Sequence, residues 1–515
     1  MKILFHNSKR ILKVISEENE VIPFSKKGSI SSGMMELAVQ YPTSKIVWCH
    51  TDFEDYLNLT EVQQFMHHDR MMFTYNPQNK GFLGTKIGYV EDSPFININK
   101  NVVYPTWQMS SVVGIVHASL LRVVKNQIKL DSDFDYYLNS LAKIANALGL
   151  LCYSQPKLLN SNKIEERFNT SKFILFRFVK QHYRMRWVFL LFINMVIYER
   201  KAPIFPLLSS LFFRNRNIDK INLKAIEVNS VSKVIDSGTI DVIIPTIGRK
   251  KFLYDFLKDL EKQTYLPSNV IIVEQNPIEN SISELDYLIS EKWPFKIKHI
   301  FTHQAGACNA RNIALNETEK EWIFMADDDI RIKDSFLEEA FNQINKFGVN
   351  AITFGCYNYG YNSNKKYKNE MQWESFGSGC SIVKREVVQR IYYRKGFEFG
   401  YGEDSDFGMQ LRNKGIDILY SPEPEILHLK APVGGFRTKP FLEWQNDVIQ
   451  PKPSPTAMLY KIMHVSQEEI NGYRTILFFK FYKLQSIKNP ILYFLNFRKQ
   501  WKQSLYWANQ LKNKV

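Results

Sequence analysis

In the second half of the chain, short apolar runs alternate with longer segments whose apolar residues follow helical spacing. The apolar runs are expected to be strands, and they cover residues 241–245, 270–274, 297–301 and 322–326. Between the first two lies the stripe of an amphipathic helix, made by Phe252, Leu253, Phe256, Leu257 and Leu260. Strands that alternate with helices in this way predict a parallel sheet with right-handed crossovers.

The fourth run ends in three consecutive carboxylates. Trp322 to Met325 is continuously apolar, as expected of a strand covered on both faces, and it leads to Asp327, Asp328 and Asp329. The acids should therefore lie at the carboxyl end of a central strand, where open α/β sheets bind ligands. A divalent cation with oxygen ligands, shared with a phosphate, would screen their mutual repulsion. A solvated acidic turn is the simpler alternative.

Other strand ends and helix starts carry residues suited to a nucleotide. The first strand leads into a loop able to hold a base and its phosphates, formed by Pro245, Thr246 and Arg249. The second strand ends in Glu274, which could accept hydrogen bonds from a base or ribose. Gly306 opens a helix that contains Arg311, and a helix N-terminus favours an anion. Each signal alone has an ordinary structural explanation, but all converge on one edge of the predicted sheet.

Two further acids, a histidine and an arginine follow. Glu403 and Asp404 are framed by glycines and precede an apolar helical stripe, so they are expected in the first turn of a helix. Helix capping alone would explain one acid there. A pair beside a metal site suggests a general base, Asp404, with Glu403 supporting it or binding the acceptor. His428 at a later strand end could complete the metal shell, and Arg437 suits a lid over a pyrophosphate.

These motifs resemble those of glycosyltransferase family 2, whose members have the GT-A fold. The resemblance covers residues 239 to about 437. It rests on Asp241-Val-Ile-Ile-Pro-Thr with Arg249, Gly306-x-x-x-Ala-Arg-Asn312, Asp327-Asp-Asp329 and Gly402-Glu-Asp404-x-Asp-x-Gly408. It implies an α/β, Rossmann-like, mostly parallel sheet with helices on both faces. Glu274 departs from the pattern, because an aspartate is more usual there.

The resemblance also implies inverting, metal-dependent transfer of a sugar from a nucleotide-sugar to a hydroxyl. In such a reaction Asp404 would be the base, with Glu403 beside it. Mg²⁺ or Mn²⁺ would be held by Asp327, Asp329 and His428. Together with the observations above, the predicted nucleotide-binding residues are Pro245, Thr246, Arg249, Glu274, Gly306, Arg311, Asp327, Asp328 and Arg437.

The first 160 residues repeat part of this pattern. The segment from Gly114 to Pro156 resembles that from Gly379 to Pro422, with Asp133-Phe-Asp135 opposite Asp404-Ser-Asp406. The run that begins at Ile46 could correspond to the strand before the acidic triplet. We interpret this similarity as a degenerate internal duplication, non-catalytic because it keeps no triplet. Chance similarity of two α/β segments is the alternative.

Length, composition and net charge limit the number of domains and the classes of ligand expected for this chain. A chain of 515 residues allows two or three domains, and its 45% hydrophobic content is ordinary for a globular protein. Its net charge of +15 favours phosphate-bearing ligands, nucleic acid or an anionic membrane surface. The five cysteines show neither close pairing nor metal-ligand spacing, which favours a reduced, intracellular setting. No apolar run approaches the ~20 residues that span a bilayer.

Two segments are rich in aromatic and basic residues. The first, within residues 161–236, predicts helices that either pack between domains or dock on a membrane surface. The second, residues 473–515, has nine Lys or Arg among many aromatics and no acidic residue. An anionic membrane surface is preferred as its partner over nucleic acid. A helix packed on the enzyme with its cations in solvent is the simpler alternative.

The prediction is therefore a four-part chain. Its parts are a degenerate GT-A-like domain (1–160), an aromatic and basic helical linker (161–236), a catalytic GT-A domain (237–440) and a basic helical C-terminal region (441–515). It would act on a glycan or lipid-linked acceptor in cell-surface polysaccharide or glycoconjugate synthesis, in the cytoplasm or on the inner face of the membrane. The alternatives are a non-catalytic carbohydrate- or membrane-binding scaffold and a nucleotidyltransferase, which offers no role for Glu403 and Asp404.

Overall fold

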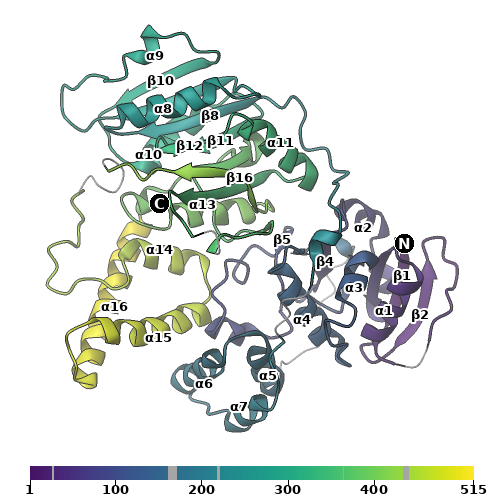
Figure 1. Ribbon diagram of the computed structural model, residues 1–515. Helices are drawn as coiled ribbons and strands as arrows, with labels where there is room; N and C mark the ends of the chain where they lie inside the picture. Colours follow the sequence, from purple (N-terminus) through teal and green to yellow (C-terminus); the bar gives the residue numbers. More distant parts are fainter. Residues whose placement is uncertain (26–27, 161–170, 217–220, 363–364, 433–439, 515) are drawn as a thin grey trace. The chain divides into compact units, whose positions relative to one another are not determined.

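The computed structural model describes the chain except residues 26–27, 161–170, 217–220, 363–364, 433–439 and 515. The described residues form two compact units (Figure 1). Unit N comprises Met1–Val231 and Val465–Lys483, and unit C comprises Ser232–His464 and Leu484–Val515. The segments predicted as a linker and as a C-terminal region are thus divided between the two units.

Unit C is built on a nine-stranded sheet. Its strands are β8 (Ile240–Thr246), β9 (Asn269–Gln275), β10 (Lys296–Thr302), β11 (Trp322–Ala326), β12 (Ile330–Arg331), β13 (Ala351–Asn358), β14 (Met371–Gln372), β15 (Cys380–Lys384) and β16 (Leu419–His428). They are ordered β10-β9-β8-β11-β15-β13-β16-β12, and β14 pairs with β16. The four predicted strands are β8 to β11, which confirms the α/β class.

The sheet is parallel from β10 to β11 and becomes mixed at β15, which is antiparallel to both β11 and β13. β11 is fully buried at the centre of the sheet. Its last residue therefore delivers the acidic triplet to the carboxyl edge.

Helices cover this sheet. They are α8 (Lys250–Glu261), α9 (Tyr287–Ser290), α10 (Ala307–Asn316), α11 (Phe336–Phe347), α12 (Arg385–Val388), α13 (Glu403–Arg412), α14 (Pro455–His464) and α16 (Pro490–Lys512). The predicted stripe lies on α8, where Leu253, Phe256, Leu257 and Leu260 are buried. α10 packs against β8 and β9, and α14 packs against α13 and α16. The elements that carry Gly306 and Asp404 are therefore held by the core.

Unit N has a seven-stranded sheet in the order β2-β1-β3-β6-β4-β7-β5. These strands are β1 (Lys2–His6), β2 (Ile11–Ser16), β3 (Lys45–His50), β4 (Met71–Tyr75), β5 (Tyr104–Pro105), β6 (Val113–His117) and β7 (Leu151–Ser154). Its helices are α1 (Ile30–Gln40), α2 (Leu59–Phe65), α3 (Ala118–Val124), α4 (Phe134–Asn146), α5 (Lys172–His182), α6 (Met185–Glu199), α7 (Ile204–Leu211) and all but the last residue of α15 (Gln467–Leu484).

Six strands of the two sheets pair in the same order and orientation. The series β1-β3-β6-β4-β7-β5 corresponds to β8-β11-β15-β13-β16-β14. In both series the neighbours are successively parallel, antiparallel, antiparallel, parallel and antiparallel. The strands also follow one another in the same order along the chain. This is the topology that a second α/β copy in unit N requires.

None of the helices within the described residues has both the length and the apolar character that crossing a bilayer requires.

Candidate functional site

A cavity of about 450 Å³ opens at the carboxyl edge of the unit C sheet. It is bordered by the ends of β8 and β11, the start of α10, the first turn of α13 and the end of β16. Most of the predicted site residues line it, namely Pro245, Thr246, Arg249, Gly306, Arg311, Asp327, Asp328, Asp329, Glu403, Asp404 and His428. The fold therefore brings together in space residues that are up to about 180 positions apart in the sequence.

The three aspartates after β11 each contact a cationic side chain, and Arg249 contacts both Asp328 and Asp329. Asp328 is buried, and it accepts hydrogen bonds from Thr246 Oγ1 at 2.6 Å and from Arg249 Nη1 at 2.6 Å. Asp327 is partly exposed and is paired with Arg311, whose Nη2 lies 2.9 Å from Oδ1. The middle carboxylate, Asp328, thus points into the protein, where residues at the end of β8 and in the loop after it hold it, whereas Asp327 is accessible from the cavity.

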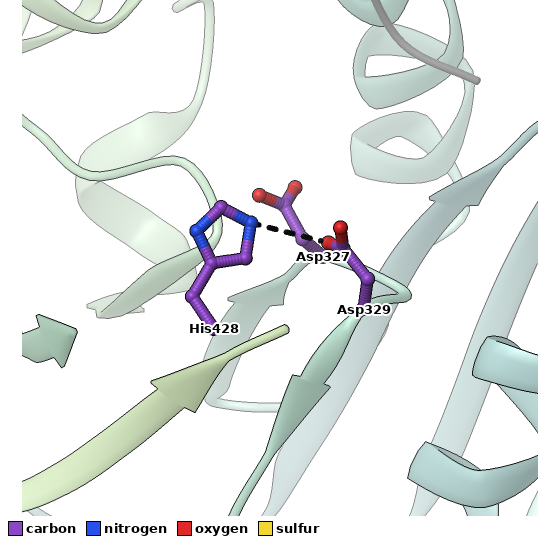
Figure 2. Close-up of side chains that lie close together, drawn as sticks. All are labelled: Asp327, Asp329 and His428. Atoms are coloured by element: carbon purple, nitrogen blue, oxygen red, sulfur yellow. Dashed lines mark ion pairs between the residues drawn. The ribbon is translucent and has the colours of Figure 1, made fainter. Parts of the chain in front are cut away.

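The third aspartate is held by the end of β16. Asp329 Oδ2 accepts a hydrogen bond from Ala431 N at 2.8 Å, and His428 Nε2 lies 3.4 Å from its Oδ1 (Figure 2). Burial opposes ionisation of Asp329, but the hydrogen bonds from His428 and Ala431 and the nearby charge of Arg249 together outweigh it and lower its pKa to about 2. At Asp328 burial outweighs the nearby arginine and raises the pKa to about 6. Asp329 therefore takes up a proton less readily than Asp328.

Three of these side chains form a candidate metal centre. Asp327, Asp329 and His428 each offer a ligand atom, and these atoms lie within 4.8 Å of one another. Figure 2 shows the side chains converging from the β11 end and from the end of β16. Two carboxylates and one imidazole suit a divalent ion such as Mn²⁺, and carboxylate oxygens also suit Mg²⁺. Gly379 leaves room for this centre, because a β-carbon there would meet Asp327 Oδ2 at 2.2 Å.

The acid pair occupies the first turn of α13, as predicted. Ser378 Oγ donates a hydrogen bond to Asp404 Oδ1. Burial, together with the nearby negative charge of Asp404, raises the pKa of Glu403 to about 7. Burial also raises the pKa of Asp404, although the Arg311 guanidinium opposes this rise. A carboxylate with a raised pKa is suited to take a proton near neutral pH.

One predicted residue within the described part of the chain, Glu274, is not among the residues that line the cavity. Glu274 is buried at the end of β9, where it accepts a hydrogen bond from Glu284 N at 3.0 Å and contacts His299 Nε2 at 2.9 Å. Its neighbour Gln275 lines the cavity instead. Arg437 lies outside the described residues.

The N-terminus of α10 is occupied by a carboxylate of the protein itself. Glu398 accepts hydrogen bonds from Cys308 N at 3.0 Å and from Asn309 N at 2.9 Å. Gly306 has a φ of 146°, and a β-carbon there would meet the Glu398 carboxyl carbon at 2.5 Å. The residue therefore has to be a glycine. The sequence pattern predicted an anion at this position but contained no signal that Glu398 would supply it.

A second residue absent from the sequence prediction is Lys430. It lines the cavity two residues after His428 and has a φ of 54°, which is unusual for a residue other than glycine. Its position after a strand end was the available signal, because it shares the edge with Asp327 and His428. It adds a cation to a cavity rich in carboxylates.

Comparison with known proteins agrees with this geometry. Residues 241–405 match the family described as Glycosyl transferase family 2. They form a family 2 glycosyltransferase domain. The chain is also similar to Glycosyltransferase GlyG of Streptococcus pneumoniae serotype 4 (strain ATCC BAA-334 / TIGR4), with 24% identity over 240 residues, covering 42% of this chain and 78% of that protein. The predicted resemblance and enzyme class are confirmed for this glycosyltransferase domain.

Solved structures resemble the chain only distantly. S. aureus TarS 1–349 matches with 17% identity and a TM-score of 0.31, covering 37% of this chain and about 60% of that chain. The same protein in complex with UDP-GlcNAc matches with 18% identity and a TM-score of 0.37, covering 53% of this chain and 81% of that chain. At these TM-scores the likeness supports no argument about the substrate of the glycosyltransferase domain.

Replacing Glu398 by alanine should destabilise unit C, because two amide groups at the start of α10 lose their acceptor. The expected loss is about 1 kcal/mol of unfolding free energy. Urea denaturation followed by tryptophan fluorescence would measure it. Glu319→Ala is the matched control, since this side chain is 61% exposed and its removal should change stability by less than about 0.5 kcal/mol. Equal stability of the two variants would show that Glu398 does not act as a cap.

Proposed function

We propose that the glycosyltransferase domain transfers a sugar with inversion, from a nucleotide-sugar donor to a hydroxyl of a glycan or lipid-linked acceptor. The observation that carries this proposal is the sharing of one cavity by two groups of carboxylates. One group, with His428, has the composition of a divalent metal centre. The other, Glu403 and Asp404, has raised pKa values suited to a base. An inverting transferase needs one group for the leaving diphosphate and one for the attacking hydroxyl.

The donor end would be organised by Asp327, Asp329 and His428. These residues would hold Mg²⁺ or Mn²⁺, which when bound supplies positive charge to the departing nucleoside diphosphate. Lys430 and Arg249 border the same cavity and can add cationic charge beside the phosphates. Arg311 has a different role in this proposal, because its pairing with Asp327 orients that carboxylate.

The acceptor end would be organised by Asp404. As the acceptor oxygen attacks the anomeric carbon, its proton passes to the Asp404 carboxylate, and the bond from that carbon to the diphosphate oxygen breaks on the opposite face. Ser378 holds one carboxylate oxygen of Asp404 by a hydrogen bond, which fixes the orientation of the other. Glu403, beside it in the first turn of α13, would bind the acceptor or support the base.

The first test combines ligand binding with activity. UDP-, GDP- and dTDP-sugars are screened by thermal shift with and without Mn²⁺. One donor class should stabilise the wild type by about 2.7 kcal/mol at a hundredfold excess over Kd. Asp329→Ala should lose the metal-dependent part. Asp404→Asn should keep the shift but lose transfer or donor hydrolysis by a factor of about 10²–10⁴.

Matched substitutions separate these effects from damage to the fold. Asp286→Asn replaces an exposed aspartate of unit C and should behave like the wild type in both assays. The absence of any donor-dependent shift in the wild type would contradict the transferase and favour a non-catalytic scaffold. Full activity of Asp404→Asn would assign the base to another residue.

The rate of transfer should rise with pH through about 7. Burial and the charge of Asp404 raise the pKa of Glu403 to about 7, so below this pH the pair carries an added proton and the base is less available. Glu403→Gln removes one of the two neighbouring negative charges. The acidic limb of the kcat profile should then move to lower pH, because Asp404 ionises more easily. A shift to higher pH would contradict this coupling.

We also propose that the start of α16 docks on an anionic membrane surface, which would place the enzyme at the inner face of the membrane in cell-surface polysaccharide or glycoconjugate synthesis. Four apolar side chains there have exposed fractions of 45–69%, namely Ile491, Leu492, Phe494 and Leu495. Lys488, Arg498 and Lys499 flank them. Exposed apolar residues flanked by cations describe an interfacial helix.

Sedimentation with vesicles tests this docking. The full chain should bind vesicles that contain phosphatidylglycerol better than vesicles of phosphatidylcholine alone. The double variant Leu492→Ser and Leu495→Ser should bind about tenfold less, because buried apolar area is lost. Leu130→Ser with Leu266→Ser is the control pair of exposed leucines outside α16. Equal binding of both double variants would exclude this surface.

A further inference from the structure

Unit N repeats the environment of the proposed base. Ser111 lies two residues before β6, as Ser378 lies two residues before β15, and Asp135 and Asp404 are each the second residue of their helix. Ser111 donates to Asp135 from N at 2.8 Å and from Oγ at 2.7 Å. The same serine–aspartate contact therefore recurs at equivalent points of the two matching sheets. Asp135 therefore corresponds to Asp404 in the structure. The sequence comparison had placed Asp133 opposite Asp404, so the two alignments differ by two residues.

The part of unit N that would hold a donor is different. In unit C the sheet continues from β8 through the parallel strands β9 and β10, whereas in unit N the neighbour of β1 is the antiparallel strand β2. Phe134 occupies the helix position that Glu403 has in α13. The segment after β3 contains Thr51 and Asp52 in place of an acidic triplet. Unit N keeps the strands that correspond to those of the proposed catalytic base, Asp404. It lacks counterparts of β9, β10 and the acidic triplet, which belong to the proposed nucleotide site of unit C.

A cavity of about 340 Å³ lies beside the strands of unit N that have counterparts in unit C. It is bordered by the end of β4, by β5, by the end of β7 and by the segment before β6. A smaller cavity, which reaches Asp135, shares Asn76, Lys80 and Ser110 with it. In the matching sheet of unit C, the strands β13, β14 and β16 occupy these places.

The lining of this cavity combines polar side chains with aromatic rings. Asn76, Gln108, Lys80 and Lys100 contribute amide and ammonium groups, and Phe95 and Tyr104 contribute rings. Such a set can bond the hydroxyls of a sugar and cover its apolar face.

The wall of the cavity is preformed. Asn76 Nδ2 donates to Lys80 O at 2.9 Å, and Lys100 Nζ donates to Asn79 O at 2.6 Å, so the segment after β4 is tied to itself and to Lys100 before β5. Gly81 lets Gln108 approach, since a β-carbon there would meet Gln108 Oε1 at 1.9 Å. A preformed wall lowers the entropy cost of binding.

We propose that this cavity is a non-catalytic carbohydrate-binding site that holds part of the glycan acceptor. That the bound carbohydrate is the acceptor rests on the function proposed for unit C. That the cavity binds a carbohydrate rests on the residues of unit N alone. The duplicated fold would then have one copy that reacts with the acceptor and one that only binds it.

The test uses the fluorescently labelled full chain on an array of bacterial and animal glycans, followed by titration of the best-bound glycan. Gln108→Ala and Lys100→Met should each weaken its binding by about tenfold, because each removes hydrogen-bond donors. Gln127→Ala and Lys129→Met are matched controls on exposed side chains of unit N and should bind like the wild type. All four variants should keep the donor-dependent thermal shift.

Two results would overturn the proposal. One is that no glycan on the array is retained by the full chain. The other is that Gln108→Ala and Lys100→Met bind the glycan as tightly as their controls do. If glycan binding depends on Gln108 and Lys100 while Asp404→Asn retains full activity, the carbohydrate site is supported and the mechanism proposed for unit C fails separately.

Discussion

The structure of unit C depends on balancing negative charge at one edge of its sheet. Six carboxylates line a single cavity there, and they would repel one another strongly if each faced only the others. The fold surrounds the aspartates with cationic groups: Arg311 pairs with Asp327, Arg249 with Asp328 and Asp329, and His428 with Asp329. The two acids on α13 keep raised pKa values instead. One edge thus contains both firmly ionised groups and groups that exchange protons near neutral pH.

This division of charge explains why the edge must be rigid. Each partner comes from a different element, so the positions of β8, α10, β11 and β16 determine which carboxylate remains available to a ligand. The glycines at 306 and 379 serve the same end, because at each a β-carbon would collide with a carboxylate group. The core of buried strands and covering helices supplies the rigidity, and the cavity residues supply the chemistry.

The two units show how one strand topology can be used differently. Six strands and a serine–aspartate contact recur in unit N, yet the parallel extension β9-β10 is replaced by the antiparallel strand β2. In open α/β sheets, the parallel strands with their crossovers place helix starts and loops at the carboxyl edge, where nucleotides bind. A sheet without this extension loses the positions from which such groups act. The remaining half retains a polar cavity.

The sequence by itself determined the α/β class, the strands β8 to β11 and the position of the acidic triplet, because these follow from local apolar periodicity and from the residues that end each run. It also predicted that most of the residues lining the cavity lie close together, since the carboxyl ends of parallel strands share one edge of a sheet. Only the tertiary structure decided that Asp328 turns inward to Arg249, that Glu274 is held by Glu284 and His299, and that Glu398 occupies the start of α10. Those outcomes depend mostly on contacts between residues far apart in the chain, which no local pattern encodes.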